Sequence, residues 1–367
     1  MVVRTPAEVF PPGEFIKDEL AEREWTQADL AEILGRPVQA INEIVAGKKA
    51  VTPETACGLG EAFGTGPELW LNLENSWRLS QSPGADANVA RRARLFELAP
   101  IKEMVRRRWL PDTSSVDDLE SALADFLELA SIQDTPSLTF AARKAGSYAE
   151  HSTAQLAWCF RAKHLAESFE VSPYSAEKLA DSLPKLRTLF ADELGVQQVP
   201  EFLADVGIRF VIVEHLKSTK IDGAALWLDD ESPVIAMSLR YDRIDNFWFV
   251  LLHELAHIRN GDRSIDADLV GSTAQATDDK PDVEKKADQV AANLLIHPRT
   301  MQAFVTRQHP RFSKSAIQDF AEQLGVHPGL VVGQLQYRKV ISYSHSRETL
   351  VPVRNLVTSV AQTDGWE

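Results

Sequence analysis

The sequence predicts a mainly α-helical protein with one small β-sheet, arranged as an N-terminal helical bundle, a helical connector and a C-terminal α+β domain. Apolar residues recur at helical spacing over most of the chain, and three short runs rich in β-branched and aromatic residues follow residue 205. A stretch rich in Ser, Pro, Gly and Asp near residue 85 is typical of a linker. The expected segments are 1–80, 81–204 and 205–345, with a C-terminal tail at 346–367.

Length and composition indicate an ordinary globular chain. Its 367 residues suffice for two or three domains, because single domains usually hold about 100–200 residues. Hydrophobic residues at 44% and charged residues at 25% argue against a disordered or fibrous protein. No apolar run approaches the roughly 20 residues of a membrane span, and the N-terminus lacks a signal-peptide pattern. We therefore expect a cytoplasmic protein with no membrane partner.

The charge and the cysteines restrict the possible ligands. A net charge of −14 argues against non-specific coating of nucleic acid, although a local positive surface could still bind it. Cys57 and Cys159 stand alone in helical patterns, which is typical of a reducing compartment and excludes a cysteine-based zinc site. Any metal would have to be bound by His and carboxylate side chains.

The first 80 residues predict three short helices with a tight turn between the second and the third. Thr26, with Asp29 three residues later, forms a capping pattern at the start of the second helix, and Gly47 closes the third. Residues 25–74 resemble the Xre-type helix-turn-helix of HigA-like antitoxins. The resemblance is carried by TQADLA, the Gly-Lys end of the third helix and the Trp-Leu-Asn-Leu tail.

This resemblance implies operator DNA as a partner. Gln39 and Asn42 would lie on the exposed face of the recognition helix and contact bases. The residues expected to approach the DNA backbone are Thr26, Gln27, Arg36, Lys48 and Lys49. Residues 1–80 carry seven Lys and Arg against thirteen Asp and Glu, so DNA binding would depend on the local basic cluster and on avidity in a homodimer. The alternative is a helical bundle that binds a protein.

Residues 81–204 show helical patterns punctuated by prolines and contain no motif with evident chemistry. We interpret them as a connector that sets the distance between the two functional ends. Two basic clusters could extend a nucleic-acid surface, but charged runs on helices are more often solvated faces, and we favour that interpretation. The clusters are Arg91, Arg92, Arg94 and Arg106, Arg107, Arg108.

The C-terminal segment places a sheet before a helix that contains the sequence HELAH. The strands are expected at 208–213, 224–228 and 234–238, and the helix at 246–259. Residues four apart lie on one face of a helix, so His253 and His257 can direct imidazole nitrogens at a single ion while Glu254 is offset to the side. The alternative is a surface helix whose two His are incidental.

Two His leave a tetrahedral zinc in need of one more protein ligand and an open position for water. We assign Glu284, which lies 27 residues after His257 in a second helical pattern. The third His of metzincins would stand six residues after His257, where the sequence has Arg263, so that subclass is excluded. The expected ion is Zn²⁺, and Mn²⁺ is possible because carboxylate-containing sites accept it.

Residues 205–340 resemble the ImmA/IrrE-like metallo-endopeptidases through the HELAH helix and the runs EKKADQVAANLLIHP and FAEQLGVHPGLVVGQLQ. The resemblance implies a zincin-like domain that cleaves a specific protein, a repressor or an antitoxin. Its implied ligands are His253, His257 and Glu284, with Glu254 as catalytic base. The sequence departs from the family pattern at Val290 and at Ile296-His297, where Phe and Met are usual, and neither departure involves a ligand.

Four further polar residues are weaker candidates. His297 and His327 could donate hydrogen bonds to a transition state, but each adjoins a Pro at a helix boundary, where capping or solvation is equally expected. We assign neither to the site. Asp262 and Asp266 could orient an imidazole, although solvation in a loop is the favoured interpretation.

Together these residues predict peptide hydrolysis. Glu254 would take a proton from metal-activated water and pass it to the leaving nitrogen, and the strand at 224–228 could pair with an extended substrate. The runner-up is a regulator of toxin–antitoxin type that binds its operator and uses the metal fold only to sense or hold a partner. In a third interpretation the helix-turn-helix docks on the active site and restrains it. The intact HELAH favours the enzyme, because a binding module has no need of Glu254.

Overall fold

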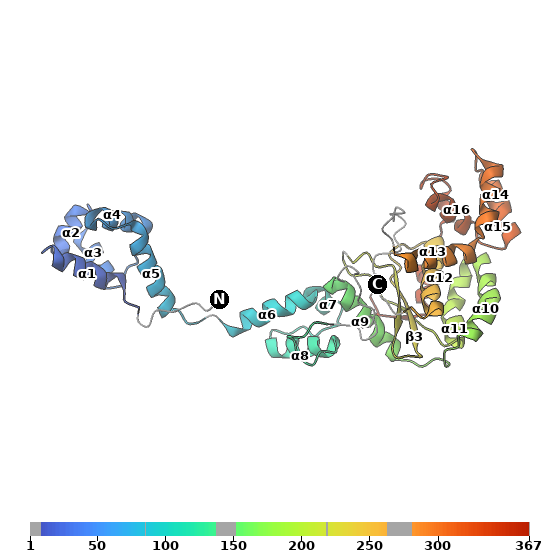
Figure 1. Ribbon diagram of the computed structural model, residues 1–367, viewed down its shortest axis with the longest axis horizontal. Helices are drawn as coiled ribbons and strands as arrows, with labels where there is room; N and C mark the ends of the chain where they lie inside the picture. The colour runs from blue at the N-terminus through green and yellow to red at the C-terminus, as the bar shows by residue number, and fades with distance from the viewer. Residues whose placement is uncertain (1–8, 85, 137–151, 218, 263–280, 367) are drawn as a thin grey trace. The chain divides into compact units, whose positions relative to one another are not determined.

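The computed structural model confirms a mainly helical chain with a small mixed sheet (Figure 1). The described residues are 9–84, 86–136, 152–217, 219–262 and 281–366. The chain divides after Val89 into two compact units. Within the described ranges, no helix combines the length and the apolar character needed to cross a membrane.

The first unit is a helical bundle around the buried ring of Trp70. Its helices are α1 (Pro12–Glu22), α2 (Gln27–Ile33), α3 (Val38–Val45), α4 (Pro53–Phe63) and α5 (Pro67–Gln81). The predicted capping box is present, because Thr26 Oγ1 accepts the Asp29 N–H at 3.2 Å and Asp29 Oδ2 accepts the Thr26 N–H at 2.7 Å. Gly47 follows α3 with a φ of +68°, a left-handed conformation that suits glycine. Local sequence signals therefore set the ends of α2 and α3.

The second unit is built on a four-stranded sheet of order β2-β3-β1-β4. The strands are β1 (Arg209–Ile212), β2 (Gly223–Trp227), β3 (Pro233–Met237) and β4 (Gln362–Thr363). β1 pairs in parallel with β3 and with β4, whereas β2 pairs antiparallel with β3 and lies at one edge. Each end of the first three strands lies within one residue of the corresponding predicted run.

Helices cover both faces of this sheet, which explains why its strands are apolar almost throughout. Successive side chains point to opposite faces, so Phe210 and Ile235 join a core with the later helices, whereas Val211 and Ala236 join a core with α9. The helices before β1 are α6 (Ala87–Leu98), α7 (Ile101–Arg106), α8 (Val116–Phe126), α9 (Thr153–Glu167), α10 (Ala176–Thr188) and α11 (Val199–Asp205), with 3₁₀ turns η2 (Leu189–Ala191) and η3 (Glu193–Gln198).

The segment predicted as a connector is largely part of this second unit. Trp158 of α9 is fully buried and its Nε1 donates to Val213 O at 2.8 Å, while Leu179 of α10 and Leu203 of α11 belong to the core on the other face. The predicted tail likewise contributes β4 to the sheet. A sheet that is apolar on both faces must be covered on both, and residues 90–204 supply much of that cover rather than a spacer.

The remaining helices follow β3. They are α12 (Ile244–Asn260), α13 (Asp282–Leu295), α14 (Pro298–Gln308), α15 (Lys314–Leu324), α16 (Pro328–Tyr337) and α17 (Arg354–Thr358), with the 3₁₀ turn η4 (Arg347–Thr349). α12 packs against β2 and β3 on one side and against α13 and α16 on others, so it lies at the centre of the unit. Its residues from Phe247 to Ile258 are buried with one exception, the half-buried Phe249.

Candidate metal centre and helix-turn-helix

The HELAH segment lies on the buried central helix α12. His253 and His257 are one turn apart, and their Nε2 atoms approach to 3.0 Å. Both rings are buried, with exposed fractions of 0% and 1%. Two imidazole nitrogens that converge inside a protein need a proton or a metal ion between them, because a buried polar atom without a partner is costly. The buried position of the two His argues against an incidental surface pair.

Helix α13 brings Glu284 to the same point. Its Oε2 lies 3.1 Å from His253 Nε2 and 3.4 Å from His257 Nε2, and the residue is buried. Tetrahedral zinc with bonds of about 2.05 Å would hold its ligand atoms about 3.3 Å apart. The three measured separations, 3.0, 3.1 and 3.4 Å, fit that geometry. These three side chains could therefore hold one divalent ion.

The outer nitrogens of both rings face carboxylates. His253 Nδ1 lies 3.0 Å from Asp288 Oδ1, and His257 Nδ1 lies 3.3 Å from Asp262 Oδ2. A carboxylate at Nδ1 favours a proton there and leaves the Nε2 lone pair free for a metal. The interpretation favoured from the sequence, that Asp262 is solvated in a loop, is therefore wrong. Asp288 was not assigned from the sequence, although it lies one turn after Glu284 on the same helical face; Asp266 lies outside the described residues.

Glu254 is separated from the ligand set and faces β2. It is 2% exposed, and the Ala225 N–H donates to its carboxylate. Its Oε2 has no hydrogen-bond partner among the residues that the structure describes. Gly223 is in close contact, since a Cβ built there would lie 2.9 Å from Glu254 Oε1. Glu254 is therefore a buried carboxylate beside the centre, available to accept a proton.

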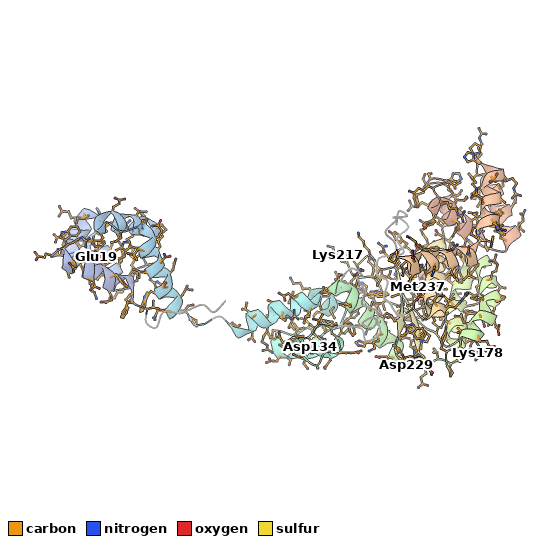
Figure 2. The ribbon with its side chains drawn as sticks, viewed as in Figure 1. Glu19, Asp134, Lys178, Lys217, Asp229 and Met237 are labelled. Carbon is orange, nitrogen blue, oxygen red and sulfur yellow. The ribbon has the colours of Figure 1, made fainter. Side chains whose placement is uncertain are left out.

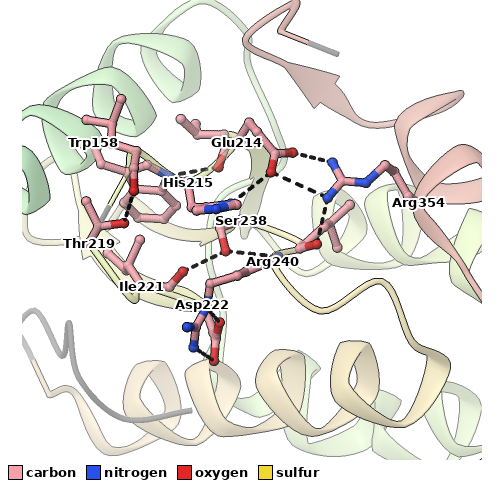
Figure 3. Close-up of polar contacts among 12 residues, drawn as sticks. Trp158, Glu214, His215, Thr219, Ile221, Asp222, Ser238, Arg240 and Arg354 are labelled. Carbon is pink, nitrogen blue, oxygen red and sulfur yellow. Dashed lines mark hydrogen bonds and ion pairs between the residues drawn. The ribbon is translucent and has the colours of Figure 1, made fainter. Parts of the chain in front are cut away.

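Residues around β2 fix its position. Arg240 donates two hydrogen bonds to the buried Asp222 carboxylate, at 2.6 and 3.0 Å, and Ser238 Oγ donates to Ile221 O at 2.7 Å (Figure 3). Bidentate pairing of this kind restricts both side chains. The start of β2, beside Glu254, is consequently held in place by the end of β3.

Electrostatics at the centre favour a cation. Burial alone lowers the pKa of His253, but the carboxylates of Asp288 and Glu284 raise it to about 10. Burial likewise lowers the pKa of His257, but the Glu284 carboxylate has the larger effect. The pKa of His257 is therefore also raised. Burial raises the pKa of Glu254. Excess negative charge in a buried site is compensated by a proton or by a metal ion.

His297 and His327 serve as helix caps. Nδ1 of His297 accepts the Arg299 N–H at 3.3 Å at the start of α14, and Nδ1 of His327 accepts the Gly329 N–H at 3.1 Å at the start of α16. A ring nitrogen used in this way satisfies a free N–H of the first helical turn. The capping role considered from the sequence is confirmed for both.

Another group of potential ligands lies on the surface of the second unit. Glu128, His164 and Glu167 bring ligand atoms within 4.8 Å of one another. However, Lys163 Nζ lies 2.5 Å from Glu128 Oε1 and 3.6 Å from Glu167 Oε1, so an ammonium group already neutralises the carboxylates. The buried centre on α12 and α13 is the better metal site.

In the first unit the predicted DNA contacts occupy α2, α3 and the turns beside them. Gln39 and Asn42 are exposed on α3, and Gln39 Nε2 donates to Glu43 Oε1 at 3.2 Å. Thr26, Lys48 and Lys49 are exposed, while Gln27 and Arg36 are half-buried. Arg36 pairs with Glu54 at 3.2 Å. The exposed amides and the two Lys are therefore accessible to a partner.

Several arginines of the two basic clusters of the second unit bind other groups of the protein. Arg91 pairs with Asp117 at 2.6 Å and with Glu120 at 2.8 Å. The Arg107 side chain is only 3% exposed, and its guanidinium donates to Glu214 O and His215 O at 2.6 and 2.7 Å. The interpretation of all six arginines as a solvated face is therefore wrong for Arg107, because its helix packs on the loop after β1.

Comparison with known proteins identifies the first unit. A helix-turn-helix family model matches residues 16–70. The uncharacterized HTH-type transcriptional regulator YddM of Escherichia coli K12 is 32% identical over 71 residues, which cover 19% of this chain and 76% of YddM. The chain therefore belongs to the helix-turn-helix family through its N-terminal module.

Two solved structures each resemble about a fifth to a quarter of the chain. A putative antidote protein of a plasmid maintenance system from Nostoc punctiforme is 40% identical, over 20% of this chain and 86% of that one, with a TM-score of 0.20. The Pseudomonas aeruginosa antitoxin HigA, solved with the higBA promoter, is 28% identical, over 26% of this chain and 99% of its own, also with a TM-score of 0.20. None of these three relatives covers more than 26% of this chain.

Proposed function

We propose that this protein is a DNA-binding regulator whose second unit is a metal-dependent endopeptidase that cleaves a specific regulatory protein, a repressor or an antitoxin. The observation that carries the enzymatic part is the convergence of His253, His257 and Glu284, with Glu254 buried beside them. A site that only held a metal would need the three ligands and no fourth carboxylate. The geometry fits hydrolysis better than binding alone.

Each residue has a distinct part in this mechanism. A bound Zn²⁺ or Mn²⁺ would supply Lewis acidity and lower the pKa of a coordinated water. Glu254 accepts the water proton and delivers it to the leaving nitrogen, and its low exposure keeps bulk water from competing for that proton. Asp288 and Asp262 hold the two imidazoles with Nε2 towards the centre.

The outer edge of β2 gives a binding mode for the substrate. Among the strands that the structure describes, β2 pairs only with β3 and lies at the end of the sheet. An extended peptide could add to that edge as a further strand, with main-chain hydrogen bonds to Gly223–Trp227. The Ala225 N–H donates to the Glu254 carboxylate, so the proposed general base contacts the strand to which we propose the substrate adds.

Operator binding is the function proposed for the first unit. It rests on membership of the helix-turn-helix family and on the exposure of Gln39 and Asn42 on α3, the helix that such modules place in the major groove. HigA of Pseudomonas aeruginosa was solved with its promoter. We infer that this module directs the chain to its own operator, as a homodimer with two half-sites.

One experiment distinguishes the enzyme from a regulator that merely binds metal. Glu254→Gln should retain metal and lose cleavage of a co-expressed repressor or antitoxin by roughly a hundredfold or more, because glutamine cannot take the proton. Glu284→Ala should lose metal as well as cleavage. Metal analysis and mass spectrometry of the fragments provide the readout. If wild type and Glu254→Gln give the same fragments, or neither cleaves while both repress transcription, the regulator without proteolysis is correct.

A further inference from the structure

Val38 is an apolar residue that α3 exposes to solvent at its first position. The buried side of this helix consists of Ile41, Ile44 and Val45, which join the core of the first unit. Val38 is instead 44% exposed and stands directly before the exposed Gln39. Single exposed apolar residues are ordinary on a protein surface. However, the N-terminal residues of a recognition helix contact base edges in the major groove, so an apolar side chain there bears on which bases are read.

The charges of the first unit favour α3 over α1 as the helix that meets DNA. Three exposed carboxylates, Glu14, Asp18 and Glu22, and the half-buried Glu19 lie on α1 (Figure 2). By contrast, two exposed lysines closely follow α3. DNA phosphates are attracted by the lysines and repelled by the carboxylates. A duplex is therefore drawn towards α3, whose first turn carries Val38.

Gln39 and Val38 suit different groups of a base pair. Gln39 Nε2 donates to Glu43 Oε1 at 3.2 Å, one turn further along α3, and this bond orients the amide. The second N–H and the oxygen of that amide match the two major-groove positions of adenine. Val38 forms no side-chain hydrogen bond, so it can contact only an apolar group favourably. The apolar group that base pairs present in the major groove is the 5-methyl group of thymine.

We propose that Val38 contacts the 5-methyl group of a thymine and thereby selects a T·A pair in the operator half-site, beside the base that Gln39 reads. The proposal rests on the operator binding proposed above and specifies what α3 selects. Valine is branched at Cβ and has few rotamers, so it presents a fixed apolar surface at little cost in side-chain entropy. Burial of one thymine methyl group should change the affinity about fourfold, the equivalent of about 0.8 kcal/mol.

Replacement of thymine by deoxyuridine tests this contact, because it removes the methyl group and leaves base pairing unchanged. Fluorescence anisotropy with the full-length protein first locates the bound duplex in the gene's own promoter. Each thymine of that duplex is then replaced in turn, together with its symmetry mate in the other half-site. At one position, wild type should bind the uracil duplex about four- to sixteenfold more weakly, since one or two methyl contacts are lost.

Val38→Ser should bind that thymine duplex and its uracil counterpart within twofold of each other, because the short hydroxyl side chain makes no apolar contact with the methyl group. Val38 is exposed, so the variant should keep the fold, which circular dichroism verifies. Leu69→Ser is the matched control, since Leu69 is 45% exposed in the first turn of α5. This control should keep the wild-type preference for thymine. The uracil scan of wild type needs no variant, so it tests the contact even if Val38→Ser is unstable.

Two results would overturn the role of Val38 while operator binding stands. In the first, no thymine position changes the wild-type affinity more than twofold. In the second, Val38→Ser keeps the full loss on the uracil duplex, because the methyl group then acts through DNA shape or through another residue. If no promoter duplex is bound even at low salt, operator binding and the role of Val38 fail together.

Discussion

Asp288 Oδ1 lies 3.0 Å from His253 Nδ1, and Asp288 stands one helical turn after Glu284, a proposed ligand on the same helix. Helix α13 thus carries both a proposed metal donor and the carboxylate that we propose orients another donor. Removal of such an orienting partner commonly weakens metal affinity by about 10- to 100-fold without removing a ligand.

We therefore expect Asp288→Asn to bind one Zn²⁺ per chain about 10- to 100-fold more weakly than wild type. Competition with a chromophoric chelator measures the affinity. Asp282→Asn is the matched control, since Asp282 is an exposed carboxylate on the same helix. Equal affinities for Asp288→Asn and wild type would show that the carboxylate does not orient His253.

The contact between Gly223 and Glu254 gives a second prediction. A Cβ at position 223 would lie 2.7 Å from Val250 Cγ1 and 2.9 Å from Glu254 Oε1, both closer than carbon atoms tolerate. Gly223→Ala should displace Glu254 or β2, lower stability by about 1–3 kcal/mol and reduce cleavage, yet retain the metal. Urea unfolding, metal analysis and the cleavage assay report on these effects.

Gly84→Ala is the control for that variant, because a Cβ there meets no atom within 4 Å. It should leave stability, metal content and cleavage unchanged. If Gly223→Ala has the stability and the cleavage rate of wild type, β2 accommodates the added methyl group. The close approach of β2 to Glu254 would then not be required for function.

Parts of this site were predictable because they depend on local spacing. The four-residue separation of His253 and His257 on a helix places both rings on one face, whatever the tertiary fold. Thr26 and Asp29 likewise cap α2 through a contact within one turn. Glu284 could be assigned because its helical face carries a carboxylate at the position that the resemblance requires.

Other parts depend on which elements pack together, and the sequence does not contain that information locally. Trp158 and its neighbours on α9 show helical spacing, but nothing in that spacing indicates that the helix covers the sheet. Asp262 follows α12 in a loop, and only the turn at Gly261 brings it back to His257. β4 is two polar residues, Gln362 and Thr363, recognisable only through their pairing with β1.

Stability at low pH should depend on Glu214. Burial raises the pKa of this carboxyl, but hydrogen bonds from His215 and Arg354 outweigh burial and hold it below the ordinary value of 4.5. The ionised form is thus favoured by folding, so its contribution is fully present above about pH 4.5 and is lost as the pH falls through the folded-state pKa.

Urea unfolding of wild type and Glu214→Gln at pH 7, 5, 4 and 3 checks this sign. The difference in unfolding free energy should be constant between pH 7 and 5 and shrink below pH 4.5. Glu231→Gln, which alters an exposed carboxylate, should show no comparable change. A difference that grows as the pH falls would contradict the assignment of Glu214 as a carboxylate stabilised by Arg354.

The last prediction concerns operator binding by the first unit. Lys48 and Lys49 are exposed beside the end of α3, where they can neutralise DNA phosphates, and Gln39 is exposed on α3 itself. Lys48→Gln and Lys49→Gln should each weaken binding to all sequences and reduce the slope of log affinity against log salt by about 1. Gln39→Ala should instead cost about 1–3 kcal/mol on the operator and relax the preference for it. Fluorescence anisotropy with the gene's own promoter, from low to physiological salt, separates the two effects.

Lys17→Gln is the control, because Lys17 is on α1 and already pairs with Glu14 at 2.7 Å. If the promoter is not bound even at low salt, the proposal of operator binding is overturned and the alternative, a bundle that binds a protein, is favoured.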